Sequence, residues 1–115
     1  MLLRVATGKS KTIRVRRPAN AGGFSPNGRL VAYTAKVGRS WEVFTARTDG
    51  KGIRRITRNR KINLTPTFSP NGRKLAFIQG SGERQKIGIV NLRTMKIKYE
   101  NAPGSYNRIE QWLPK

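Results

Sequence analysis

One six-residue motif occurs twice in this chain, and its spacing limits the possible folds more than any other feature. Residues 24–29 read Phe-Ser-Pro-Asn-Gly-Arg, and residues 68–73 repeat the motif letter for letter, 44 positions later. The same offset aligns Val-Ala-Tyr at residues 31–33 with Leu-Ala-Phe at residues 75–77. Self-similarity at a fixed period of this length is typical of architectures that copy one supersecondary unit along the chain. The sequence therefore predicts a repeat protein.

Each copy of the repeat predicts short β-strands separated by turns. In Ser-Pro-Asn-Gly, proline presets one backbone angle and Asn-Gly tolerates positive φ, which favours a hairpin between a first and a second strand. Further β-rich runs predict the remaining strands, which we expect at residues 30–35, 41–46, 53–57, 74–79, 86–92 and 95–99. Four strands per repeat make one blade of a β-propeller. The predicted fold class is therefore all-β, with four-stranded antiparallel β-propeller blades.

The repeat register also predicts how the chain is divided. Residues 2–6 and 12–16 match the third and fourth strands of a blade, and Trp112 falls one period after Phe68. The expected segments are the outer half of a blade at 1–17, complete blades at 18–61 and 62–105, and the first strand of a further, shared blade at 106–115. This incomplete arc has about two and a half blades, whereas closed propellers have about 4 to 8.

Because such an arc cannot close on itself, other residues must complete the ring. Three possibilities stay open: copies of the chain assemble with one another, the chain docks in a larger complex, or it is a fragment of a longer propeller. The first two predict a homo-oligomer or partner interface built from apolar residues of the terminal segments, namely Leu3, Val5, Ile13, Val15, Ile109, Trp112 and Leu113.

The repeat resembles the TolB-like β-propeller repeat. The resemblance lies in the aromatic-Ser-Pro-Asn-Gly-Arg turn, the Leu-Ala-Phe strand after it, and a third strand that ends before Asp49-Gly50. It covers nearly the whole chain, with two full repeats and partial repeats at both ends. The family turn usually contains Ser-Pro-Asp-Gly, so Asn27 and Asn71 depart from it. The resemblance implies a propeller with an interaction role, as in periplasmic translocation proteins, peptidase-gating propellers and sensors.

The net charge is the most unusual part of the composition. The chain has 25 Lys and Arg against 5 Asp and Glu, which gives a formal charge of +20. Such an excess attracts polyanions, and nucleic acid is the usual candidate. Along the fourth strands, basic and apolar residues alternate, which predicts a basic rim, although lysines also protect strand edges from aggregation. The predicted nucleic-acid contacts are Arg14, Arg16, Arg17, Arg54, Arg55, Arg58, Arg60, Lys61, Lys96 and Lys98.

The residues needed for common catalytic and metal sites are missing or scattered. The chain has no His and no Cys, which excludes classical triads and thiolate metal sites. Its five acids, at positions 42, 49, 83, 100 and 110, form no evident constellation. We therefore expect no enzyme activity, no metal and no cofactor.

Two functional hypotheses follow. The first is a non-catalytic interaction module that self-assembles or docks in a larger complex and binds nucleic acid or another polyanion, with ribosomal RNA as one candidate, through phosphate contacts without sequence specificity. The second is a fragment of a TolB-like periplasmic or secreted propeller that mediates protein–protein interactions. No apolar run is long enough for a membrane span or a signal-peptide core, so we expect a cytoplasmic location.

Overall fold

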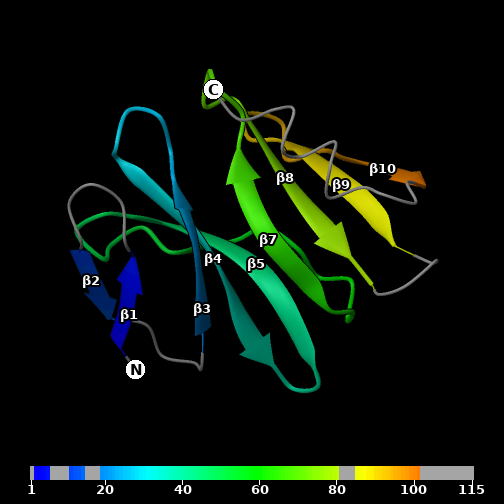
Figure 1. The fold of residues 1–115 in the computed structure, drawn as a ribbon, viewed down its shortest axis with the longest axis horizontal. Coiled ribbons are helices and arrows are strands. Elements are labelled where there is room, and N and C mark those ends of the chain that lie inside the picture. Colours follow the sequence, from blue (N-terminus) through cyan, green and yellow to red (C-terminus); the bar gives the residue numbers. More distant parts are fainter. Residues whose placement is uncertain (1, 6–10, 15–18, 81–84, 102–115) are drawn as a thin grey trace.

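The computed structural model describes residues 2–5, 11–14, 19–80 and 85–101, and its regular secondary structure there consists of strands alone (Figure 1). Strands β1 (Leu2–Val5) and β2 (Lys11–Arg14) form a two-stranded antiparallel sheet near the N-terminus. This small sheet lies beside the first strand of a larger sheet, where β1 contacts β3.

Two four-stranded sheets make up most of the described residues. The first has the order β3 (Ala19–Phe24), β4 (Leu30–Val37), β5 (Ser40–Arg47) and β6 (Arg54–Arg55). The second has the order β7 (Asn63–Phe68), β8 (Lys74–Gln79), β9 (Lys86–Asn91) and β10 (Ile97–Asn101). Each strand pairs antiparallel with the next along the chain. The predicted all-β propeller fold is confirmed.

The repeated turn motif has the same hydrogen bonds in both sheets. Asn27 Oδ1 accepts from Ser25 Oγ at 2.6 Å and from the Arg29 backbone N–H at 3.0 Å. In the second sheet, Asn71 Oδ1 accepts from Ser69 Oγ at 2.7 Å and from the Arg73 backbone N–H at 3.0 Å. Gly28 adopts a φ of 72°, which a residue without Cβ reaches without strain. An amide oxygen thus does what a carboxylate oxygen would do in this turn, without its charge.

Alternation along the strands divides the apolar side chains between two faces of each sheet. The layer between the two sheets contains Ala32, Val43 and Ile56 from the first sheet, with Phe68, Leu75, Phe77 and Val90 from the second. Strand β7 lies at this junction and contacts β3, β4 and β5 (Figure 1). On the opposite face of the first sheet, Tyr33 stacks on Phe44 with ring centroids 5.6 Å apart. On the opposite face of the second sheet, Ala76, Ile78 and Ile87 form a third cluster.

The fourth strands differ from the sequence prediction. In the first sheet the strand was expected at 53–57, but β6 covers only Arg54–Arg55. Beyond it the Ile56 N–H still donates to the Val43 carbonyl at 2.8 Å, but the Val43 N–H donates to the Thr57 hydroxyl at 2.9 Å, so a side chain takes the place of one bond of the backbone ladder. In the second sheet β10 begins two residues later than expected, because Met95 belongs to a turn: its N–H donates to the Asn91 carbonyl at 2.7 Å and its φ is 63°.

Tyr33 provides a prediction about stability at alkaline pH. Its side chain is buried, and burial raises the pKa of the phenol above its ordinary value of 10.0. In the unfolded chain the phenol ionises near that ordinary value, at a pH of about 10, while in the folded chain it remains protonated to higher pH. The free energy of unfolding should therefore fall as pH rises past about 10 and through the folded pKa.

Urea unfolding of Tyr33→Phe at pH 9 and 11, chosen to lie about one unit on either side of the ordinary pKa of a phenol, measures this contribution. The variant should lose less stability between the two pH values than the unmodified chain. Tyr99→Phe removes a hydroxyl from a tyrosine that is 42% exposed and serves as the control for the loss of a phenol. Equal declines in both variants would show that Tyr33 makes no contribution.

Candidate functional site

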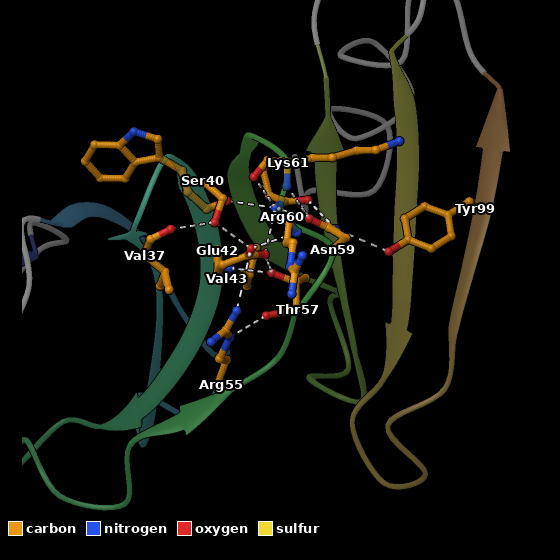
Figure 2. A network of polar contacts seen from close by, with 12 residues as sticks. Val37, Ser40, Glu42, Val43, Arg55, Thr57, Asn59, Arg60, Lys61 and Tyr99 are labelled. Atoms are coloured by element: carbon orange, nitrogen blue, oxygen red, sulfur yellow. Dashed lines mark hydrogen bonds and ion pairs between the residues drawn. The ribbon is translucent and has the colours of Figure 1, made fainter.

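Glu42 is the best-enclosed charged side chain among the described residues. It lies in β5 and is 0% exposed. One carboxylate oxygen, Oε2, accepts from Ser40 Oγ at 2.8 Å and from the Arg60 backbone N–H at 3.1 Å. The other, Oε1, accepts from Thr57 Oγ1 at 2.6 Å and from Asn63 Nδ2 at 3.2 Å. Figure 2 shows Ser40, Thr57 and Arg60 around the carboxylate. Buried charge is tolerated when donors surround it in this way.

Arg55 supplies the opposite charge. Its Nη2 lies 3.7 Å from Glu42 Oε2, and its Nε donates to the Thr57 carbonyl at 2.8 Å. The side chain is 28% exposed, so one part of the guanidinium faces solvent while another faces the buried carboxylate. Glu42 and Arg55 together hold strand β5 against the segment that leaves β6.

That segment, residues 56–62, connects the two sheets and is fixed by polar contacts. The side-chain amides of Asn59 and Asn63 donate to each other at 2.9 Å in both directions. The Trp41 N–H donates to the Lys61 carbonyl at 3.2 Å, and Trp41 bridges Ile62 in parallel. Arg60 has a φ of 60°, a left-handed conformation that is unfavourable for a side chain with Cβ. Its hydrogen bond to Glu42 holds it there.

Four arginines meet around one shallow pocket above this network. The pocket has a volume of about 560 Å³ and is lined by Val37, Gly38, Arg39 and Ser40 from the end of β4 to the start of β5, and by Arg55, Arg58 and Arg60. The side chains of Arg39, Arg58 and Arg60 are exposed and make neither an ion pair nor a hydrogen bond with any described residue. The pocket therefore has an excess of positive charge close to solvent.

The structure brings only part of the predicted basic rim together. Arg55, Arg58 and Arg60 share the pocket, and Lys61 follows them in the connection. Arg54 is exposed, and its Nη2 donates to the Leu92 carbonyl at 3.5 Å. Lys96 and Lys98 are exposed near and on β10, in the other sheet, and do not line the pocket.

Other predicted residues lie at the N-terminal sheet or outside the described residues. Arg14 ends β2, Leu3 and Val5 belong to β1, and Ile13 pairs directly with Leu3. Their roles stay predictions. The residues that lie outside the described ranges are Val15, Arg16, Arg17, Ile109, Trp112 and Leu113.

Two central residues of the site, Glu42 and Arg39, were not predicted. The only sequence signal for Glu42 is an acid inside an apolar strand, and its counterpart one period later is Lys86, which is exposed. Arg39 follows Gly38, whose φ of 62° marks the turn between β4 and β5.

Asp49 has an ordinary structural role. Asp49 Oδ2 lies 2.8 Å from Arg47 Nη2 on the surface, and its Oδ1 accepts from the Lys51 N–H at 2.9 Å in a turn. In the described ranges, His, Cys, Asp and Glu form no group of three that could hold a metal ion. A helix long and apolar enough to cross a membrane is likewise not found in those ranges.

Comparison with known proteins identifies the repeat. No family model matches the chain. The Tol-Pal system protein TolB of Francisella tularensis subsp. mediasiatica is 34% identical over 83 residues, which cover 70% of this chain and 19% of that protein. The crystal structure of TolB from Acinetobacter baumannii has a TM-score of 0.59 at 21% identity, and the match covers 79% of this chain and 23% of that one. The chain thus spans about a fifth of the curated relative's length.

The same fold also occurs in an enzyme. An oligogalacturonate lyase in complex with manganese matches with a TM-score of 0.59 at 15% identity, over 90% of this chain and 30% of that one. At this identity the likeness shows the fold alone.

Two predictions from the sequence are wrong. The expected nucleic-acid or other polyanion partner is contradicted, because TolB homologues bind proteins of the Tol-Pal system. The expected cytoplasmic location is contradicted, because TolB homologues are periplasmic. A formal charge of +20 raises attraction to anions in general, but it does not select the partner or the compartment.

The repeat itself is confirmed by both kinds of comparison. Curated TolB proteins match about 70% of the chain, and TolB propellers share its fold. This chain is therefore an arc of TolB-like β-propeller repeats.

Proposed function

We propose that this chain is a non-catalytic propeller segment that binds a partner protein in the periplasm. The observation that carries the proposal is the 34% identity over 83 residues with a Tol-Pal system protein TolB. The matched length exceeds one 44-residue repeat, so the similarity extends beyond a single turn motif.

The polar groups of the described residues support a binding role over catalysis. A catalytic carboxylate needs an oxygen within reach of substrate. Both oxygens of Glu42 are instead engaged by protein donors, and the side chain is fully buried. Asp49 serves a turn and a surface ion pair. The arginine-lined pocket offers fixed positive charge, which is suited to recognition.

The blade boundaries at 18–61 and 62–105 remain part of this proposal. Strands β3–β6 and β7–β10 are the four-stranded units inside these ranges. A partner protein would meet the same two blades wherever the rest of the ring comes from.

The test has two parts, one in the native host and one with purified proteins. An epitope tag at the native locus, followed by osmotic-shock fractionation, should place the protein in the periplasmic fraction. Surface plasmon resonance with the 115-residue chain, against each purified periplasmic component of the host's Tol-Pal system, should give saturable binding to at least one. A cytoplasmic protein that binds none of them would overturn the proposal.

A further inference from the structure

Three arginine side chains in the pocket form no ion pair and no side-chain hydrogen bond with any described residue. Arg39, Arg58 and Arg60 are all exposed, and no ion pair or side-chain hydrogen bond involves them within the described part of the chain. A guanidinium carries five N–H donors in a planar fork that matches a carboxylate in two parallel hydrogen bonds. Three such groups around one cavity form a receptor for an anionic group.

The pocket is assembled from two separate chain segments. Arg39 comes from the turn between β4 and β5, whereas Arg58 and Arg60 come from the connection between the sheets. Ser40 and the Arg60 backbone N–H both donate to Glu42 Oε2, so one buried oxygen joins the two segments (Figure 2). The arginines are therefore presented from backbone that is already held in place, and binding need not order it.

The charge balance leaves the pocket able to accept an anion. Glu42 is the one acid in contact with the lining residues within the described ranges, and it is fully buried, with five groups of the protein directed at it. Arg55 lies closest to its charge, at 3.7 Å. The other three guanidinium groups have no such counter-charge among the described residues.

We propose that Arg39, Arg58 and Arg60 form a carboxylate-binding pocket that takes an Asp or Glu side chain of a partner protein. The source of the carboxylate rests on the proposed function, because Asp and Glu side chains are the main anionic groups that a protein partner presents. That the pocket binds an anionic group follows from the three arginines alone and does not depend on the proposed function. It goes beyond the predicted basic rim, since Arg54, Lys96 and Lys98 have no part in it.

The test measures binding of a defined acidic peptide to the 115-residue chain by fluorescence anisotropy. The probe is a labelled, end-blocked peptide with the sequence Gly-Ser-Glu-Glu-Ser-Gly. The control probe has glutamine at both glutamate positions. Salt at about 0.15 M screens charges beyond about 8 Å. The acidic probe should bind, and the glutamine probe should bind at least about tenfold more weakly.

Matched double variants separate the pocket from the overall charge. Arg58→Gln with Arg60→Gln should weaken binding of the acidic probe about tenfold. Arg73→Gln with Arg93→Gln removes the same charge from exposed positions away from the pocket and should leave binding within about twofold. Arg39→Gln alone, on the other segment, should also weaken binding, and this variant leaves residues 58–62 unchanged. Circular dichroism checks that each variant is folded.

Three outcomes would overturn the pocket. Equal weakening in both double variants would show general attraction to a basic chain. An unchanged affinity of the Arg39→Gln variant for the acidic probe would show that Arg39 does not bind the carboxylate. Competition by inorganic phosphate at much lower concentration than acetate would show a phosphate site.

If the pocket variants lose the acidic probe while binding to Tol-Pal components is unchanged, the pocket is not the partner site, although the proposed function stands. Peptide binding without any Tol-Pal partner would preserve the pocket and reject the proposed function.

Discussion

Replacement of Glu42 by alanine is expected to lower the free energy of unfolding by about 3–5 kcal/mol, because several buried donors lose a charged acceptor and each such loss costs about 1–3 kcal/mol. The alanine would leave the hydroxyls of Ser40 and Thr57, the amide of Asn63 and the backbone N–H of Arg60 without their acceptor. A buried donor that loses its acceptor has already given up its hydrogen bond to water on folding, and this desolvation cost is then no longer compensated. Because native stabilities are about 5–15 kcal/mol, this single change approaches the limit of folding.

Urea unfolding followed by tryptophan fluorescence measures the effect. With a typical slope near 2 kcal/mol per molar urea, the midpoint should fall by about 1.5–2.5 M. Asp49→Ala removes the same charge from an exposed acid and should cost no more than about 1 kcal/mol. Glu42→Gln, which keeps the shape and one carbonyl oxygen, should lie between these two variants. A Glu42→Ala loss no larger than that of Asp49→Ala would show that the network around Glu42 contributes little to stability.

Replacement of Gly22 by alanine is the second large expected effect. A Cβ at Gly22 would lie 2.5 Å from the Ala32 carbonyl oxygen, 2.7 Å from Pro66 Cγ and 3.0 Å from the Pro66 carbonyl oxygen. Two of these three atoms are backbone, so they cannot move away as a flexible side chain can. Ala32 belongs to β4 of the same sheet and Pro66 to β7 of the second sheet, so relief of the overlaps would require movement both within the first sheet and between the two sheets. We expect a loss of about 1–3 kcal/mol, the usual cost of overpacking.

The neighbouring glycine provides the control. A Cβ at Gly23 would meet no atom within 4 Å. Gly23→Ala reduces the freedom of the unfolded chain in the same way as the first variant, and it should be neutral or stabilise by about 0.4–1 kcal/mol. The difference between the two urea midpoints measures the overlap of the added Cβ with β4 in the same sheet and with β7 in the second sheet. Equal midpoints would mean that β3 is not so closely packed against β4 and β7 at Gly22.

The repeat predicted the features that depend on local sequence. Ser-Pro-Asn-Gly determines the hairpins at both positions, because proline, the Asn acceptor and the positive φ of glycine act within a few residues. Alternating apolar residues located β4, β5, β8 and β9 to within two residues at each end. These elements were predictable because their hydrogen bonds and packing recur in each copy.

The candidate site was less predictable because it depends on where the two copies differ. Position 42 is Glu in the first repeat, whereas one period later position 86 is Lys. Only the folded chain brings Glu42 to Thr57 and Asn63, 15 and 21 residues further along. The short fourth strand has the same cause, since the Thr57 hydroxyl competes with the backbone ladder. Arg55, predicted on an open rim, turns partly inward for this reason.

The apolar layer between the sheets also bears on what counts as a folding unit in this chain. Ala32, Val43 and Ile56 meet Phe68, Leu75, Phe77 and Val90 across that layer, so each blade holds only one half of a common core. In repeat proteins, stability comes from such nearest-neighbour interfaces as much as from the repeats themselves. A single blade cut out of the chain would expose its half of the layer to water. We therefore expect the two blades to unfold in one cooperative transition, as a unit of about twice the 44-residue sequence period.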